Sequence, residues 1–310
     1  FTGNTFSGNE GDIAILSGVP AAYYTDILAI SAANNNAVVE DQRLSPALLS
    51  VAYVDDSAPA GGNGTQAKPL QTITAGINRV VSGGTVLVAA GTYAEENILI
   101  TKGLTLQGSG SNSTFIAPNI TTNNSTIVVQ NPTGDVKIDG FTFTMKPKIN
   151  YGSAVLVTGT DIPVDSATVT ISNNVVNGSN DGTKSDFGFY GQGNHAKLVI
   201  TNNTINKTGD NPIVMEQQIG STTVSNNTFY ITDSPDYDAY FSMAYGGKTI
   251  TTPQIVQGNT FYLDHSGTGY SEAITFDIVV LNSWNGNTTD TGHYSDVQIK
   301  DNLIYTGGPE

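Results

Sequence analysis

Cysteine is absent from the 310-residue chain, which excludes disulfides, thiolate nucleophiles and cysteine-based zinc sites. Basic side chains are scarce: 12 lysines and arginines face 27 aspartates and glutamates, a net charge of −15. A surface this acidic repels nucleic-acid backbones and anionic lipid. We therefore expect that the protein has no nucleic-acid partner and that it tolerates cations. No apolar run reaches the roughly 18 residues of a membrane span, so no membrane insertion is expected.

A short pattern recurs along the chain instead. An apolar residue is followed by a polar pair, usually Asn-Asn or Gly-Asn, and a second apolar residue stands five positions after the first. The leading apolar residues are Ile138, Ile171, Ile200, Val224, Val256 and Ile299. They lie 24 to 43 residues apart. The shortest interval fits one bare coil of a solenoid, and the longer ones fit coils that carry loop insertions.

The pattern predicts short parallel strands stacked coil upon coil. Val169 and Ile171 alternate with Thr168, Thr170 and Ser172, which places every second side chain inward. Asparagine tolerates left-handed backbone and therefore suits the bend between two strands. Stacked asparagine amides can also hydrogen-bond along the stack. Because one coil cannot bury its own inner face, neighbouring coils must do so.

The first half of the chain fits the same scheme, with one helix. Apolar residues within Leu70–Val81 follow helical spacing, and a short amphipathic helix there would cap the open end of a solenoid. Strands are expected at Thr85–Val88, Asn97–Ile100, Leu104–Gln107, Thr114–Ile116 and Thr126–Val129.

The segment that surrounds this helix resembles the opening of right-handed parallel β-helix proteins of the pectate-lyase-like superfamily. The residues that carry the likeness are Tyr53, Val54, Gly62, Asn63, Gly64, Lys68, Pro69, Thr72 and Ile73. With the Asn-Asn coils, it covers roughly residues 53 to 305. The resemblance implies an all-β fold, a right-handed parallel β-helix over residues 51–310, with a capping helix near 70–81 and loop insertions. It does not fix a function, since one fold hosts many.

Residues 1–50 precede the expected cap and form a separate strand segment. Phe1–Phe6 repeats the Gly-Asn-Thr-Phe sequence and the five-residue spacing of apolar residues found in the coil at Val256–Phe261. Further strands are expected at Asp12–Leu16 and Asp26–Ile30, and a loop at Asn34–Pro46. Two interpretations remain open: the segment folds back on its own solenoid, or it completes the C-terminal end of a neighbouring copy. The second assigns assembly roles to Phe1, Phe6, Ile13, Ile15, Ile299 and Ile304.

Catalytic residues are hard to place. The resemblance implies that an enzyme of this fold would use carboxylates, calcium and a basic residue on acidic polysaccharide. The two arginines, Arg43 and Arg79, fall outside the central coils, and Lys137 and Lys300 alternate with apolar neighbours and point outward. The three histidines lie in separate loops without metal-ligand spacing. We therefore predict a protein that is not an enzyme.

Two oxygen-rich clusters are candidate calcium sites. The 233–238 cluster comprises Asp233, Asp236 and Asp238, and the 285–290 cluster comprises Asn285, Asn287 and Asp290. Exposed aromatic rings in the same insertions would contact carbohydrate or a protein partner. These rings are Tyr237, Tyr240, Tyr245 and Trp284. Turn formation by the acids and packing of the rings on the solenoid wall are the competing interpretations.

The sequence thus favours a structural or adhesive protein of a cell surface or extracellular filament that assembles head to tail. The many Asn, Thr and Gly residues, with few Lys and Arg and no Cys, resemble prokaryotic extracellular surface proteins of this fold. The alternative is a polysaccharide-binding module or a calcium-dependent polysaccharide lyase.

Overall fold

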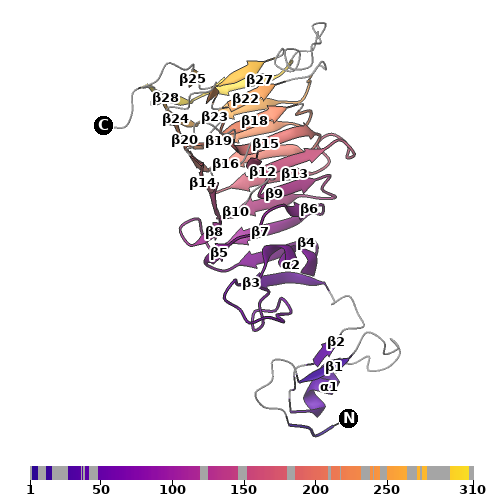
Figure 1. Cartoon of the computed structure of the whole chain (residues 1–310). Helices are drawn as coiled ribbons and strands as arrows, with labels where there is room; N and C mark the ends of the chain where they lie inside the picture. The colour runs from indigo at the N-terminus through magenta and orange to yellow at the C-terminus, as the bar shows by residue number, and fades with distance from the viewer. Residues whose placement is uncertain are drawn as a thin grey trace.

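The computed structural model describes residues 2–5, 12–15, 27–35, 37, 39–41, 48–118, 125–145, 152–179, 186–208, 211–216, 218–231, 238–239, 241–244, 250–263, 271–272, 274–277 and 294–306. Over most of these residues the chain winds through three parallel sheets in turn, coil after coil (Figure 1). The architecture is an all-β parallel β-helix, as the sequence predicts.

Within the described residues the first sheet has nine strands. Their spatial order is β27 (Val297–Lys300), β23 (Gln254–Gln257), β19 (Thr222–Ser225), β16 (Lys197–Thr201), β13 (Thr168–Ser172), β10 (Val136–Asp139), β7 (Leu104–Gly108), β4 (Val80–Val88) and β3 (Leu49–Val54). The leading apolar residues of the repeat lie in register on this sheet, from Ile138 through Ile171 and Ile200 to Ile299. The predicted coil alignment is confirmed.

The second sheet follows the bend in each coil. It runs β28 (Leu303–Thr306), β24 (Thr260–Leu263), β20 (Thr228–Ile231), β17 (Thr204–Asn206), β14 (Val175–Asn177), β11 (Thr142–Thr144), β8 (Thr114–Ile116) and β5 (Gly91–Tyr93). The second apolar residue of each repeat lies in register here: Phe143, Val176, Ile205, Phe229, Phe261 and Ile304.

The third sheet closes the coil. It runs β26 (Thr275–Asp277), β22 (Phe241–Ala244), β18 (Ile213–Glu216), β15 (Asp186–Asn194), β12 (Gly152–Gly159), β9 (Ile127–Gln130) and β6 (Ile98–Ile100). A separate short pair joins β21 (Asp238–Ala239) to β25 (Ser271–Glu272).

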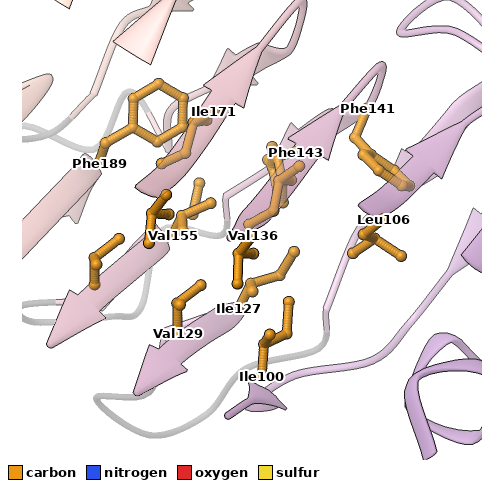
Figure 2. Close-up of a cluster of buried hydrophobic side chains, with 14 of the residues drawn as sticks. Ile100, Leu106, Ile127, Val129, Val136, Phe141, Phe143, Val155, Ile171 and Phe189 are labelled. Atoms are coloured by element: carbon orange, nitrogen blue, oxygen red, sulfur yellow. The ribbon is translucent and has the colours of Figure 1, made fainter. Parts of the chain in front are cut away.

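The core lies between the three sheets. Figure 2 shows Ile127 and Val155 from the third sheet, Ile171 from the first and Phe143 from the second converging on the interior. All four side chains are fully buried. Because each coil contributes only a few such side chains, stability comes from their continuous stacking along the axis.

Helix α2 (Ile73–Arg79) covers the end of the solenoid at β3 and β4, and it confirms the predicted cap within slightly shorter bounds. Thr72 caps its first turn, and the carboxylate of Glu95 accepts hydrogen bonds from the amides of Ile73 and Thr74 at 2.5 and 2.9 Å. Gly76 lies so close to Val54 and Val86 that a side chain would clash. The helix therefore packs directly over the open coil.

The first fifty residues differ from the prediction in part. Strand β1 (Ile13–Ile15) is confirmed and pairs in parallel with β2 (Val39–Asp41), which lies in the segment predicted as loop. The strand predicted at Asp26–Ile30 is wrong, because Ile27–Ala33 forms helix α1. This Ile-Leu-Ala-Ile-Ser-Ala-Ala run is too short to separate the two periods, and its alanines favour helix. We call the described residues up to Asp41 the N-terminal module.

Candidate functional site

A column of asparagines runs along the bend between the first and second sheets. We call it the Asn ladder, and its rungs are Asn174, Asn203, Asn227, Asn259 and Asn302. Each of the first four rungs donates from its backbone amide to the side-chain Oδ1 of the next rung at 2.9 Å. Each also donates from Nδ2 to that same Oδ1, at 3.0 to 3.2 Å. The proposed stacking of asparagine amides is confirmed.

The residue before each rung explains why the polar pairs are Asn-Asn or Gly-Asn. Asn173, Asn202 and Asn226 have φ of 56°, and Gly258 has 63°. This left-handed conformation turns the chain from the first sheet to the second, and asparagine and glycine tolerate it best. The first residue of the pair therefore makes the bend, and the second makes the ladder.

The ladder has a direction. Donor groups point toward the C-terminal coil at every step, and the remaining Nδ2 proton bonds back to a carbonyl of the preceding coil, as from Asn259 to Val224 at 3.0 Å. At Asn302 the Nδ2 bond to the Val256 carbonyl remains, at 2.9 Å. Among the described residues nothing accepts from the Asn302 backbone amide or from its second Nδ2 proton. The ladder thus ends with donors facing outward.

The coil that carries this last rung lies at the end of the stack opposite α2 (Figure 1). In the described part of the chain, β27 and β28 each pair on one side only. Ile299 and Ile304 are 53% and 51% exposed, whereas their in-register neighbours Val256 and Phe261 are buried. Both residues were predicted for assembly, and the structure brings them together at this end of the stack, on what we call the terminal coil face.

Of the other predicted assembly residues, Ile13 and Ile15 lie in the N-terminal module. Ile15 is buried and Ile13 partly buried beside β2, while Phe1 and Phe6 lie outside the described residues. Asn4 donates to the Oδ1 of Asn34 from its backbone amide at 3.3 Å and from Nδ2 at 2.7 Å. The repeated Gly-Asn-Thr-Phe sequence around Asn4 does not by itself reveal this contact.

Asp139 is the carboxylate most tightly held by its neighbours in the described solenoid. Burial alone would raise its pKa, but hydrogen bonds from Ser172, Gln107, Lys137 and Asn173 outweigh burial and lower the pKa to about 2. The adjoining hollow is lined by Gln107–Ser113, Gly140 and Asn173, and these residues include no second titratable group. Asp139 therefore stays ionised and fully engaged, which is a structural role.

Two tyrosine hydroxyls, on buried Tyr93 and partly buried Tyr190, are similarly occupied. Tyr190 donates to Glu216 at 2.5 Å, and burial followed by the nearby carboxylate raises its pKa. Burial also raises the pKa of Tyr93 to about 12, and its hydroxyl donates to the Ala89 carbonyl at 3.1 Å. Neither hydroxyl ionises near neutral pH, so both act as hydrogen-bond donors.

The basic and histidine side chains that the sequence singled out are engaged at separate places in the described structure. Arg79, on the capping helix, donates from Nε to the Asn63 carbonyl at 2.8 Å, and Arg43 lies outside the described residues. Lys137 pairs with Asp139 at 3.0 Å, and Lys300 donates to Gln298. His195 contacts the Ile162 carbonyl through Nδ1, and the other two histidines fall outside the described residues.

The candidate calcium residues fall largely outside the described residues. Of the 233–238 cluster only Asp238 is described, as the first residue of β21, and the 285–290 cluster lies wholly outside. No group of three histidine, aspartate or glutamate side chains that could hold a metal occurs in the part of the chain that the structure describes. Calcium at the two clusters stays a prediction.

The aromatic candidates Tyr237, Tyr240, Tyr245 and Trp284 also lie outside the described residues. A different aromatic column lies on the outer side of the second sheet. Tyr230, Tyr262 and Tyr305 stack with ring centroids 4.7 and 5.0 Å apart and nearly parallel planes. Tyr230 and Tyr305 are partly exposed. Sequence alone could have found this column, because a tyrosine follows the second apolar residue in three consecutive coils.

Comparison with solved structures finds proteins of low similarity to this chain. A carrot pectin methylesterase is 14% identical, with a TM-score of 0.47 and 82% of each chain covered. The Escherichia coli protein YbhC is 12% identical, with a TM-score of 0.47 and 98% of each chain covered. The ORF18 protein of Geobacillus virus E2 is 15% identical, with a TM-score of 0.36 over 72% of this chain and 60% of that one.

No protein-family model and no curated protein matches the sequence. Neither helix among the described residues has the length and apolarity to cross a bilayer. The assignment of the fold rests on the three parallel sheets and on the register of their strands.

Proposed function

We propose that this chain is a non-enzymatic structural or adhesive protein of a cell surface or extracellular filament. Copies associate head to tail, with the opening segment Phe1–Ile30 of one copy on the terminal coil face, around Asp296–Tyr305, of the next. The observation that carries the proposal is the terminal coil face itself. Among the described residues, two strands with unpaired edges carry Ile299 and Ile304, whose counterparts in the neighbouring coil are buried. Natural sheets cover such edges or use them for pairing.

The apolar contribution of this face is large enough to matter. The exposed side chains whose in-register neighbours are buried are Val297, Ile299 and Ile304, at 38%, 53% and 51% exposed. Full burial of a large apolar side chain contributes about 1.5–3 kcal/mol, so covering the exposed part of these three groups contributes about 3 kcal/mol. Backbone hydrogen bonds along both strands would add to this. Association of two proteins must first offset lost rotational and translational freedom, and a contact of this size begins to do so.

The extracellular assignment rests on composition and the non-enzymatic one on the described polar groups. A cysteine-free, strongly acidic surface rich in Asn, Thr and Gly suits a protein built for stacking outside the cell. Asp139 and Tyr190 are engaged in hydrogen bonds that hold the coils, which supports a structural rather than a catalytic use.

The test compares a substitution on the terminal coil face with one on the side wall. Ile304→Lys places a charge where the next copy would stack. Leu99→Lys places the same charge on an equally exposed side chain, 48% against 51%, on the outer wall. By sedimentation velocity and negative-stain electron microscopy, the parent chain and Leu99→Lys should form linear assemblies and Ile304→Lys should remain monomeric. A parent chain that is monomeric at every concentration would refute the proposal.

One observation favours the alternative of a polysaccharide-binding module. The tyrosine column at Tyr230, Tyr262 and Tyr305 offers ring edges and hydroxyl groups along the outer wall, and aromatic side chains with a polar end are suited to sugars. Affinity electrophoresis in gels containing polysaccharide would test it. Retardation that Tyr230→Ala abolishes would support carbohydrate binding, and unchanged mobility of the parent chain in neutral and acidic polysaccharides would exclude it.

A further inference from the structure

The contact between Asn4 and Asn34 repeats one step of the Asn ladder. As in the solenoid, the backbone amide and Nδ2 of one asparagine both donate to the Oδ1 of the other. The residue before Asn4, Gly3, has φ of 76° and donates its amide to the Ala33 carbonyl. Gly258, before the rung Asn259, has φ of 63° and donates its amide to the Lys300 carbonyl. The N-terminal module therefore repeats the paired asparagine contact of a ladder step, although Gly3 bonds one residue before Asn34 and Gly258 bonds two residues before Asn302.

The step between Asn4 and Asn34 lacks donors to the Oδ1 of Asn4, and the last rung of the ladder carries donors of that kind. Asn4 is exposed, and among the described residues no group donates to its Oδ1. Every interior rung receives two such donors from the rung before it. At Asn302, the backbone amide and one Nδ2 proton are donors for which the described residues offer no further rung. The two vacancies are complementary in chemistry and in direction.

We propose that Asn4 of one copy is the rung that follows Asn302 of another copy, so that the ladder continues across the contact into Asn34. The inference rests on the head-to-tail function proposed above and specifies the partner, a second copy of this chain, and the register. Asn302 would donate to Asn4 Oδ1 of the incoming copy. The free Nδ2 proton of Asn4 would bond back to the Ile299 carbonyl, as Asn259 does to Val224.

The sequence supports this register independently. Gly3-Asn4-Thr5-Phe6 is identical to Gly258-Asn259-Thr260-Phe261, which forms an interior step of the ladder. With Asn4 stacked on Asn302, Phe1 and Phe6 align with Ile299 and Ile304, the two side chains that the terminal coil face exposes. A shift by one residue would turn the incoming apolar side chains outward.

The length of the connection between the N-terminal module and the solenoid decides whether the module docks on its own copy or on a second copy. Strands β3 and β27 stand at opposite ends of a nine-stranded sheet, about 38 Å apart at about 4.8 Å per strand. An intact module docked on its own terminal coil would place Asp41 two coils further, about 48 Å from β3. The connection from Asp41 to Leu49 spans at most about 28 Å when fully extended. The intact module can therefore reach the terminal coil of another copy but not its own.

Cysteine pairs test the register directly, because the chain has no cysteine of its own. In the proposed contact Thr5 lies beside Leu303, within the Cα separation that a disulfide spans. We expect a mixture of Thr5→Cys and Leu303→Cys proteins to form a disulfide-linked dimer under mild oxidation. Thr2→Cys is the matched control: it lies three residues out of register with Leu303, about 10 Å away, and should not link to it. Equal linkage by both pairs, or linkage by the control alone, would overturn the register.

Removal of the rung tests the ladder itself. Asn4→Ala in the full chain deletes the acceptor for Asn302 and should weaken association at least about tenfold, equivalent to about 1.4 kcal/mol. Gln66→Ala, which shortens an exposed amide elsewhere, should leave association unchanged. If linear assemblies form but tolerate Asn4→Ala and do not link Thr5 to Leu303, the head-to-tail function stands and this inference is wrong. If the parent chain does not assemble, both are wrong.

Discussion

Asn227 offers the sharpest test of what holds the solenoid together. Its side chain is buried and makes four hydrogen bonds. Oδ1 accepts from the backbone amide and Nδ2 of Asn203 at 2.9 and 3.0 Å, and Nδ2 donates to the Ile200 carbonyl and to Asn259 Oδ1, each at 3.0 Å. Asn227→Ala removes all four bonds and leaves the Asn203 amide in the interior without an acceptor.

The expected loss follows from these bonds. A hydrogen bond contributes a net of about 0.5–1.5 kcal/mol, and a buried donor left without a partner costs about 1–3 kcal/mol. Four bonds and one orphaned amide therefore predict that Asn227→Ala lowers the free energy of unfolding by at least about 3 kcal/mol. This is large for a polar-to-alanine change in a bend, where surface substitutions usually cost under about 0.5 kcal/mol.

The neighbouring asparagine supplies the control. Asn226 is exposed, and its contribution is the left-handed backbone at φ of 56°. Asn226→Gly should change stability by less than about 0.5 kcal/mol, since glycine occupies the same place at residues 140 and 258. Asn226→Ala should cost about 1 kcal/mol, because alanine tolerates this conformation poorly.

Two measurements determine the loss of stability in these variants. Urea denaturation followed by circular dichroism gives the change in unfolding free energy where the transition remains cooperative. Hydrogen exchange at the Asn203 amide gives the local change, which matters in a solenoid whose coils contact only their neighbours. If Asn227→Ala costs no more than Asn226→Ala, or if the Asn203 amide keeps its protection, the ladder does not stabilise the fold and the reasoning fails.

Three further predictions concern charge and chemistry. The lowered pKa of Asp139 contributes about 2 kcal/mol above pH about 4, which is lost as the pH falls toward about 2; Asp139→Asn should flatten this part of the stability curve. Millimolar calcium should raise the melting temperature relative to chelator through the 233–238 or 285–290 cluster, and an unchanged value would argue against both sites. Pectate, alginate and chondroitin should yield no unsaturated uronate with or without calcium, and ultraviolet absorbance rising above background would contradict the non-enzymatic assignment.

The sequence predicts the solenoid well because its signals are repeated. Each coil repeats the same pattern of two apolar residues, five positions apart, with a polar pair between them. The register of Ile171 with Ile200, and of Phe229 with Phe261, therefore follows from aligning the copies. The capping helix is predicted because helical spacing extends over several turns. The double use of asparagine, one for the bend and one for the ladder, also follows from the chemistry of the residue.

Isolated segments are where prediction fails. Residues 27–33 occur once, and a seven-residue run carries too little periodicity to separate strand from helix. The ionic state of Asp139 depends on Gln107 and Ser172, which lie one coil below and one above and have no sequence proximity to it. The Asn4–Asn34 contact could not be predicted for the same reason. The two residues are 30 positions apart, and Asn34 follows helix α1 rather than a strand whose repeat could be aligned with residues 1–6.

The direction of the Asn ladder also limits which assemblies are possible. Asn302 presents donors and Asn4 presents an acceptor, so two terminal coil faces placed together would set donor against donor. A two-fold contact between C-terminal ends therefore cannot form the ladder hydrogen bonds, whereas a head-to-tail contact can form them. We accordingly expect Leu303→Cys protein alone to form no disulfide-linked dimer through its terminal coil face, although the same thiol links to Thr5→Cys. A ready Leu303→Cys homodimer would show that the faces meet symmetrically and that the chain closes into dimers rather than extending into filaments.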